Sequence, residues 1–549
     1  MGYIRFRYII PFVWLICFAS CKKNTDNEPL LENTIDKTNV YLNDEFENKL
    51  RDSVWYYYKL LSLWEKAIPP KSNQLELLDS VNYLRNNYTQ YFQTAGTVLE
   101  YLKYSTDYAI NGKTSSNRYF PGENPYAFYK QAIKFNNGDS KNFDWYSFLD
   151  RGGFISGALS SEGISGFGMD LVYVENKQTN NGDLYVKFVT KNSPAAKAGI
   201  SRGDRLLSLN GNTNIDYNSN KGDYFNTIRG YFYNSKLNID YVTADGLTKS
   251  TLLEYQNNNY TDVVFADTIL NVASKKVGYI GLSSFVNLDA TLLVKSTFMS
   301  FQNRFNQVID KFSTANINDL VVDLRYNGGG SVYTSEYLAN TFVPSAASGQ
   351  LMYTNKLNDY LVSLGWTESD EDFAPVYFSK RSNINLPRIY FLVSKETASA
   401  SELLINVLSP YMEVYIIGNN TQENGKTIAN NTYGKPVGFF PLQIFRSNIE
   451  IYVTSFQMFN KNGYGNYFDG LKPNAHVWEF DSFKDFGNRD ESMLASALHH
   501  IEKGNFKITA SRSVSGTDNQ SAVRNDLGTI SEKKLEGMYK IPRRTIKLK

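Results

Sequence analysis

Residues 397–402 read Thr-Ala-Ser-Ala-Ser-Glu and follow the apolar run Ile-Tyr-Phe-Leu-Val at 389–393. The run has the composition of a buried strand, and the residues after Glu402 are apolar at helical spacing: Leu403, Leu404, Val407 and Leu408,. A strand, a short run of small residues and a helix predict an α/β unit with a serine hydroxyl at the helix N-terminus. Backbone N–H groups and the helix dipole favour developing negative charge there, so the stretch is typical of a serine nucleophile.

A serine nucleophile needs a base, and the composition restricts the choice. The chain has only three histidines, His476, His499 and His500. The last two follow the Ala- and Leu-rich segment 492–498, which indicates a packing helix,. A Ser-His-Asp arrangement is therefore not favoured, although His476 stays open. The other common activator of serine is a lysine held neutral by burial, because desolvation disfavours the charged amine.

Two downstream lysines are candidates for that base. Lys435 lies between Gly434 and Gly438 and is followed by apolar residues, whereas Lys426 lies among the polar residues of 421–427. Flanking glycines allow close backbone approach, and apolar neighbours suit a desolvated amine. The setting of Lys426 is typical of a solvated loop. Lys435 is the better candidate.

These segments resemble the nucleophile and lysine motifs of the carboxyl-terminal processing peptidases, also called tail-specific proteases. The resemblance implies a Ser-Lys dyad with Ser399 as the nucleophile and Lys435, in Thr-Tyr-Gly-Lys at 432–435, as the base. A third match is Val-Val-Asp-Leu-Arg-Tyr-Asn-Gly-Gly-Gly at 321–330, a buried strand entering a glycine-rich turn. In the family this turn supplies one oxyanion N–H and the residue after the nucleophile the other. That implies the following donors: Gly329 or Gly330, together with Ala400.

One departure from the family pattern concerns spacing. Lys435 follows Ser399 about ten positions later than the family expects, and the simplest account is an insertion spanning Thr421–Asn431. Surface insertions of this size cost little free energy. Without an insertion the expected lysine position falls on Asn424. The position of the family's third polar residue falls on Phe439, and Gln443 is a weak candidate, so that role stays open.

Each motif also has a structural reading. Ser399 and Glu402 form an N-cap to N3 pair, which alone is an ordinary capping box,. A glycine triplet at 328–330 is also typical of a tight βα turn, and a single lysine is usually a surface residue. Asp323 and Glu402 have structural interpretations, the first within the buried strand and the second as a cap. The order and context of the motifs together favour the catalytic interpretation.

Residues 160–256 resemble a PDZ domain. Ser-Gly-Phe-Gly-Met at 165–169 matches the loop whose backbone N–H groups capture a peptide's terminal carboxylate, and the strand after it pairs with the peptide,. The resemblance implies peptide binding by Gly166, Phe167, Gly168 and Met169. Residues 193–200 and 203–211 match a PDZ helix and strand. The alternative is a module that only packs against the core.

The 549-residue chain is expected to be an α/β (α+β) multidomain protein with three folded parts,. Apolar residues at helical spacing predict a helical N-terminal domain at 41–150, followed by the PDZ domain. Alternating strands and helices predict an α/β tail-specific-protease catalytic core at 275–503. Residues 504–549 are rich in Ser, Thr, Asn and basic side chains, which predicts a flexible basic tail,.

The N-terminus has the pattern of a targeting segment. Arg5 and Arg7 precede an apolar run that is too short to span a bilayer, and Phe-Ala-Ser-Cys at 18–21 resembles a bacterial lipobox,. Residues 1–20 are the expected signal peptide and Cys21 the lipidated thiol, so a bacterial cell-envelope location is expected, periplasmic or surface-exposed. Residues 21–40 read as a tether. An ordinary signal peptide with a chance cysteine is the alternative.

The resemblance implies a serine endopeptidase that acts on proteins or peptides with accessible C-termini. No metal or organic cofactor is implied, and a net charge of +2 gives no electrostatic case for nucleic acid,. One alternative is an inactive PDZ lipoprotein in which the insertion displaces Lys435 from Ser399. Another is a glycan-binding envelope lipoprotein, suggested by 40 tyrosines, although no exposed aromatic platform motif is evident.

Overall fold

The computed structural model describes the following residues: 40–42, 44–70, 72–80, 82–105, 144, 146–160, 164–176, 178–259, 261–369, 371–423, 426–445, 448–506, 526–530 and 537–540. The predicted signal peptide, Cys21 and the tether up to residue 39 lie outside these ranges. Within them, no helix has both the length and the apolar character needed to cross a bilayer.

The predicted catalytic core contains a sheet with a parallel centre. Its strand order is β19-β18-β17-β13-β10-β9, and β22 pairs with β18. The strands are β9 (Val264–Val272), β10 (Lys275–Leu282), β13 (Asp319–Asp323), β17 (Arg388–Leu392), β18 (Glu413–Glu423), β19 (Lys426–Ala429) and β22 (Ala475–Val477). The pairs β10–β13, β13–β17 and β17–β18 are parallel, whereas β9 and β19 are antiparallel to their neighbours.

Helices cover both faces of this sheet. Leu320 and Val322 of β13 point into the cluster that contains α9 (Phe301–Ala315), α10 (Val332–Phe342) and α12 (Ala400–Leu408). Val321 points the other way, into the cluster of α13 (Ser492–Lys503). Alternate side chains of one strand are therefore buried on opposite faces. This explains why the central strands read as continuous apolar runs rather than alternating ones.

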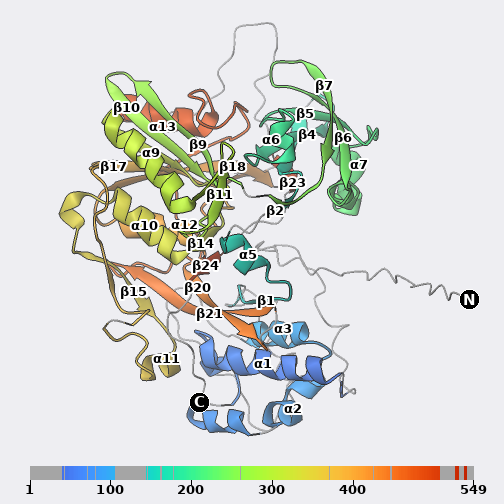
Figure 1. The fold of residues 1–549 in the computed structure, drawn as a ribbon, viewed down its shortest axis with the longest axis vertical. Coiled ribbons are helices and arrows are strands. Elements are labelled where there is room, and N and C mark those ends of the chain that lie inside the picture. The colour runs from blue at the N-terminus through green and yellow to red at the C-terminus, as the bar shows by residue number, and fades with distance from the viewer. Residues whose placement is uncertain are drawn as a thin grey trace, which may run out of the picture.

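A second sheet lies below the first in Figure 1, with the order β14-β24-β20-β21-β15-β16 and β1 paired with β21. Its strands are β1 (Phe148–Asp150), β14 (Gly329–Ser331), β15 (Leu351–Lys356), β16 (Val376–Tyr377), β20 (Val437–Ile444), β21 (Ile449–Asn460) and β24 (Gly537–Tyr539). The smaller elements beside the two sheets are α5 (Phe154–Ser160), β11 (Thr291–Val294), β12 (Thr297–Ser300) and α11 (Asp359–Ser363).

The N-terminal helices pack on this second sheet. The helices are α1 (Glu45–Leu61), α2 (Tyr83–Asn87) and α3 (Ala95–Ser105), joined by 3-10 turns at Glu65–Ala67, Ser72–Asp79 and Thr89–Tyr91. Val54 and Tyr58 of α1 belong to the same buried cluster as Val453 of β21. The helices expected at 41–150 are thus present, but they share a core with the sheet, and β1 at the end of that range is one of its strands.

The predicted PDZ region forms a separate sheet with its own core, at the upper right of Figure 1. Its order is β23-β3-β4-β5-β6-β7, and β2 pairs with β8. The strands are β2 (Ile164–Gly166), β3 (Met169–Asn176), β4 (Asn181–Val189), β5 (Arg205–Leu209), β6 (Lys236–Val242), β7 (Thr248–Glu254), β8 (Gln256–Asn259) and β23 (Asp526–Ile530). Its helices are α6 (Pro194–Lys197), α7 (Tyr217–Asn220) and α8 (Asn226–Tyr231), with a 3-10 turn at Lys221–Asp223.

Two segments of the predicted flexible tail are strands, so that prediction is wrong for them. β23 joins the PDZ sheet and β24 joins the second core sheet. Met538 and Tyr539 are buried, and Ile530 is 3% exposed. Each segment is only a few residues long and is stabilised by pairing with strands far away in sequence. The composition of the tail therefore did not predict these strands.

Candidate active site

Ser399 lies in the turn between β17 and α12, in a backbone conformation that side chains rarely adopt. Its φ is +63° and its ψ is −113°. The residue is fully buried, and its Oγ atom has no hydrogen-bond partner among the described residues. Strain in a non-glycine residue is typical of functional sites, and a buried hydroxyl without a hydrogen-bond partner is unusual in a folded protein unless it has a catalytic or similar role. The hydroxyl does not cap the helix, so the capping interpretation is incomplete.

The Glu402 carboxylate joins the serine turn to the lysine segment. Its Oε2 atom accepts hydrogen bonds from the backbone N–H of Ser399, at 2.7 Å, and of Lys435, at 2.8 Å. Its Oε1 atom accepts from the N–H of Gly434, at 2.8 Å, and from the Thr432 hydroxyl. Two backbone nitrogens bound to one oxygen atom are necessarily neighbours. Ser399 and Lys435, 36 positions apart in sequence, are therefore brought together.

Glu402 is fully buried, and burial raises the pKa of its carboxyl group, while the hydrogen bonds that it accepts oppose that rise. The sequence interpretation assigned this residue only to the helix cap, because its partners at 432–435 are distant along the chain. The sequence did contain one signal for this role, an acidic residue within an apolar helix. A buried carboxylate needs hydrogen-bond partners, so such a residue indicates partners elsewhere in the chain.

Lys435 is 1% exposed and lies among aromatic rings. Its Nζ atom is 4.1 Å from the centroid of Phe439 and 5.2 Å from that of Tyr146. Gly434, just before it, has a φ of +89°, and a Cβ atom there would lie 2.3 Å from the Phe468 carbonyl oxygen. Only glycine fits this close approach. The residue that follows it, Lys435, is buried. Phe439, at the position expected for a third polar residue, instead supports the lysine side chain, and Gln443 is exposed.

The proposed insertion at 421–431 is a β-hairpin. β18 and β19 pair antiparallel from Asn420 opposite Ala429 to Glu423 opposite Lys426. The N–H of Asn430 then donates to the Asn419 carbonyl at 3.1 Å, so the chain returns to the point where it left. The added residues are accommodated within the hairpin, before the lysine segment at 432–435 begins. Lys426 lies at the tip of the hairpin, at the opposite end from Asn430.

The predicted oxyanion turn contacts the serine turn. Ala398 N–H donates to the Asn327 carbonyl at 3.1 Å, and a Cβ on Gly329 would lie 3.0 Å from the backbone N of Ala400. The N–H of Gly329 donates to Asn327 Oδ1 at 2.9 Å, so this donor is already engaged. Gly330, the next residue, is paired with Met538 in the parallel β14–β24 ladder, so its backbone is engaged as well, and Ala400 is the first residue of α12.

β24 lies between the predicted oxyanion turn and the strand that follows the lysine segment, and it pairs with both. It pairs in parallel with β14 on one side, Gly329 opposite Gly537, and with β20 on the other, Phe439 opposite Tyr539. Figure 1 shows β14, β24 and β20 side by side beneath α12. The C-terminal segment is thus part of the scaffold that places the candidate residues.

No histidine bonds to Ser399 within the described residues. The ring nitrogen Nε2 of His476 lies 3.1 Å from the Asn430 carbonyl oxygen, and burial lowers the pKa of this imidazole. His500 packs in α13, with its Nδ1 atom 2.9 Å from the Tyr390 hydroxyl. These contacts leave the lysine as the candidate base that the fold brings to the serine turn.

A buried ion-pair network anchors the strand that enters the glycine turn. Arg325 is fully buried and pairs with Asp323 and Glu491, each at 2.7 Å. Despite its burial, the pKa of the Arg325 guanidinium lies well above its usual value because these carboxylates surround it. Glu479 pairs with Arg202 of the PDZ region at 3.0 Å. The structural interpretation of Asp323 thus agrees with its place in this network.

The predicted peptide-binding loop lies at the start of β3. Gly166 and Gly168 have φ values of +148° and +77°. The Phe167 and Met169 side chains are buried in the core of the PDZ region, so they support the loop instead of facing a ligand. Any contact to a peptide from these two residues would come from their backbone.

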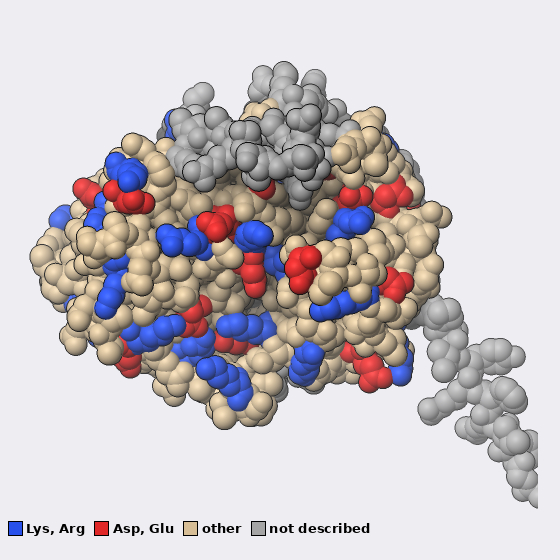
Figure 2. All heavy atoms as spheres, turned by 90° about the horizontal axis from the view of Figure 1, so that it is seen from above, with Lys and Arg blue, Asp and Glu red and all other residues tan. Residues whose placement is uncertain are grey.

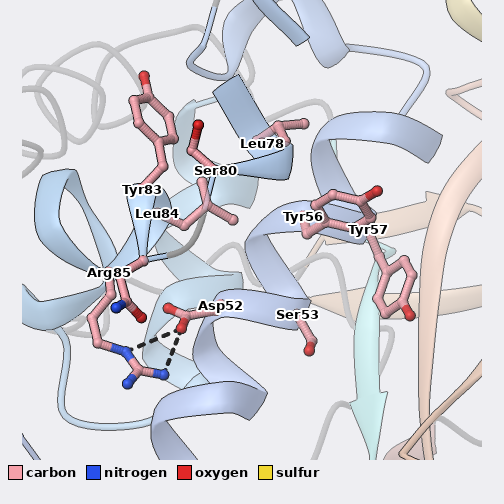
Figure 3. A pocket seen from close by; sticks show the side chains of 10 residues that line it. Asp52, Ser53, Tyr56, Tyr57, Leu78, Ser80, Tyr83, Leu84 and Arg85 are labelled. Carbon is pink, nitrogen blue, oxygen red and sulfur yellow. Dashed lines mark hydrogen bonds and ion pairs between the residues drawn. The ribbon is translucent and has the colours of Figure 1, made fainter. Parts of the chain in front are cut away.

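Other surface features lie outside this site. A depression of about 230 Å³ on α1 and α2 is lined by tyrosines and by the Asp52–Arg85 ion pair, which spans 2.7 Å (Figure 3). It contains none of the predicted site residues. On the face seen in Figure 2, acidic and basic side chains are interspersed, which agrees with the near-zero net charge.

Parts of this chain match known protein families. Residues 276–477 match the model of peptidase family S41, and residues 158–218 match that of the PDZ domain. A carboxyl-terminal-processing peptidase 3 from the chloroplast of Arabidopsis thaliana is 23% identical over 256 residues, which are 46% of this chain and 44% of the relative. The chain thus matches less than half the length of this relative.

Two solved structures are also similar. A putative S41 protease from Bacteroides fragilis aligns over 84% of this chain and 98% of its own, with a TM-score of 0.53 and 20% identity. The photosystem II D1 C-terminal processing protease aligns over 78% and 92%, with a TM-score of 0.39 and 16% identity. The family matches confirm the resemblance drawn from the motifs, and the B. fragilis structure confirms the α/β multidomain fold.

Proposed function

We propose that the chain is a serine endopeptidase in which Ser399 attacks the scissile carbonyl and Lys435 is the base. The observation that carries this proposal is the carboxylate of Glu402, which binds the backbone of both residues. The strained serine with a buried hydroxyl supports it further. The S41 match over 276–477 covers both residues.

In the proposed reaction, neutral Lys435 accepts the Ser399 proton as the hydroxyl oxygen forms a bond to the carbonyl carbon. Burial of an amine disfavours its charged form, which suits this role. The backbone N–H group of Ala400, beside the glycine turn at 328–330, would stabilise the oxyanion, and the protonated lysine would then return the proton to the leaving amine. Water repeats the sequence on the acyl-enzyme and releases the product acid.

Substrate recognition is assigned to the PDZ region. We propose that it binds unfolded segments near a protein C-terminus along β3, in line with the match over 158–218,. We also propose, from the sequence at 18–21, that Cys21 is lipidated and anchors the protein in a bacterial cell envelope,.

A matched pair of lysine variants tests the base. The chain from residue 22 onward is incubated with an unfolded protein that ends in apolar residues, and products are identified by mass spectrometry. We expect Lys435→Ala to lower the cleavage rate by about 10²- to 10⁴-fold, the usual contribution of a general base. Lys426→Ala, at the hairpin tip, should leave the rate unchanged.

Equal rates for both lysine variants would exclude Lys435 as the base. If the unmutated chain binds the peptide but does not cleave it, the inactive peptide-binding alternative would replace the proposal.

A further inference from the structure

The PDZ sheet contains a strand that comes from the far end of the chain. β23 pairs antiparallel with β3, from Asp526 opposite Val174 to Ile530 opposite Leu171. β3 follows the loop at 166–169 and pairs with β4 along its other edge. β23 therefore occupies the edge on which a peptide would add as a further strand. We propose that residues 526–530 are an intramolecular ligand of the PDZ domain, which an incoming peptide must displace.

The direction of β23 fits this role. Its C-terminal residue, Ile530, lies opposite Leu171, two positions after Met169, so the strand runs towards the loop. A peptide whose terminal carboxylate is captured by that loop would run in the same direction. The backbone of β23 thus follows the path expected for a ligand.

Side chains of β23 pack into the core that residues of β3, α7 and α8 also form. Ile530 belongs to the buried core of the PDZ region, and Leu527 packs against it. A Cβ added to Gly182 would meet Leu527 Cδ1 at 2.7 Å and Tyr217 Cβ at 2.9 Å, so these two side chains flank the same point. The segment therefore makes the apolar contacts that a bound peptide would make.

One contact links β23 to the nucleophile turn. The Nζ atom of Lys187, on β4, donates to the Thr529 hydroxyl at 3.3 Å and forms an ion pair with Glu396. The Lys187 side chain is 3% exposed, and Glu396 lies three positions before Ser399. Exchange of β23 for another peptide would change the surroundings of a lysine that also binds the nucleophile turn.

Binding is measured without catalysis, because the inference takes from the proposed function only that the PDZ region recognises peptides. The probe is a fluorescein-labelled peptide with the sequence of residues 523–530, and the protein is the chain from residue 22 with Ser399→Ala. A tethered ligand acts at an effective concentration on the order of millimolar, so it competes strongly with the probe. Adding Ile530→Asp, which places a charge in the apolar core, should tighten probe binding by about tenfold or more.

The matched control is Leu252→Asp on β7, a leucine that is 55% exposed. It should leave probe binding unchanged. A folded Ile530→Asp chain that binds the probe no more tightly than its parent overturns the proposal, as does absence of probe binding by every form. Cleavage assays then judge the proposed function separately.

Hydrogen exchange gives a second test that needs no change in that core. In the Ser399→Ala chain, saturating probe should accelerate amide exchange in 526–530 by about tenfold or more, because the segment leaves the sheet edge. β3 should stay protected, since the probe replaces β23. Unchanged exchange in 526–530 at saturation would identify β23 as a permanent strand, even if Ile530→Asp does not fold.

Discussion

Replacing Ser399 with alanine is expected to reduce peptide hydrolysis by about 10⁴-fold or more, because Ser399 is the proposed nucleophile and a neighbouring side chain cannot take over that role. The free energy of unfolding should change by less than about 1 kcal/mol. The Ser399 hydroxyl makes no hydrogen bond within the described residues, so its removal breaks none there,. The measurements are the initial rate of cleavage of an unfolded protein and a urea unfolding curve.

Ser401 provides the matched control, since it lies in the same six-residue motif and is equally buried. Its hydroxyl donates to the Asn327 carbonyl at 3.2 Å. Ser401→Ala should lower stability by about 1 kcal/mol, the usual value of one hydrogen bond, and retain activity. The reverse pattern, with Ser401→Ala inactive and Ser399→Ala active, would show that Ser401 and not Ser399 is the nucleophile.

The local geometry of the candidate catalytic segments could be predicted because each segment consists of consecutive residues. The apolar run at 389–393, the small residues after it and the amphipathic segment beyond Glu402 specify strand, turn and helix. The same holds for the strand at 321–324 and its glycine turn. Such local patterns bring Ser399 to a helix N-terminus before any long-range contact is known.

Long-range pairing could not be predicted in the same way. Residues 526–530 and 537–540 lie in a polar, low-hydrophobicity stretch, and only contact with distant edges makes them strands. Glu402 shows the same limit at the level of one side chain. Its place in the helix was evident, but its three partners at 432–435 depend on how the hairpin at 420–429 returns the chain.

Glu402 is also the residue whose loss should combine the largest effects on stability and turnover. Glu402→Ala leaves four donors without their acceptor in a fully buried site, and each hydrogen bond to a charged group contributes about 1.5–3 kcal/mol,. We expect the free energy of unfolding to fall by about 4 kcal/mol or more. Urea unfolding measures this loss, and the exposed Glu413→Gln serves as the control.

Glu402→Gln distinguishes the role of Glu402 in aligning Ser399 and Lys435 from its role in supporting the fold. The amide keeps the size of the side chain, but its NH₂ group faces N–H donors that need an acceptor. In either orientation the amide oxygen serves only one pair of donors, Ser399 with Lys435 or Gly434 with Thr432, so the link between the serine turn and the lysine segment is disturbed while the fold is largely retained. We expect kcat to fall by about 10- to 100-fold with little change in KM, because misplacement of reacting groups by about 1 Å costs that much. A stable Glu402→Gln chain with full kcat would show that the carboxylate only supports the fold, and that something else aligns the serine and the lysine.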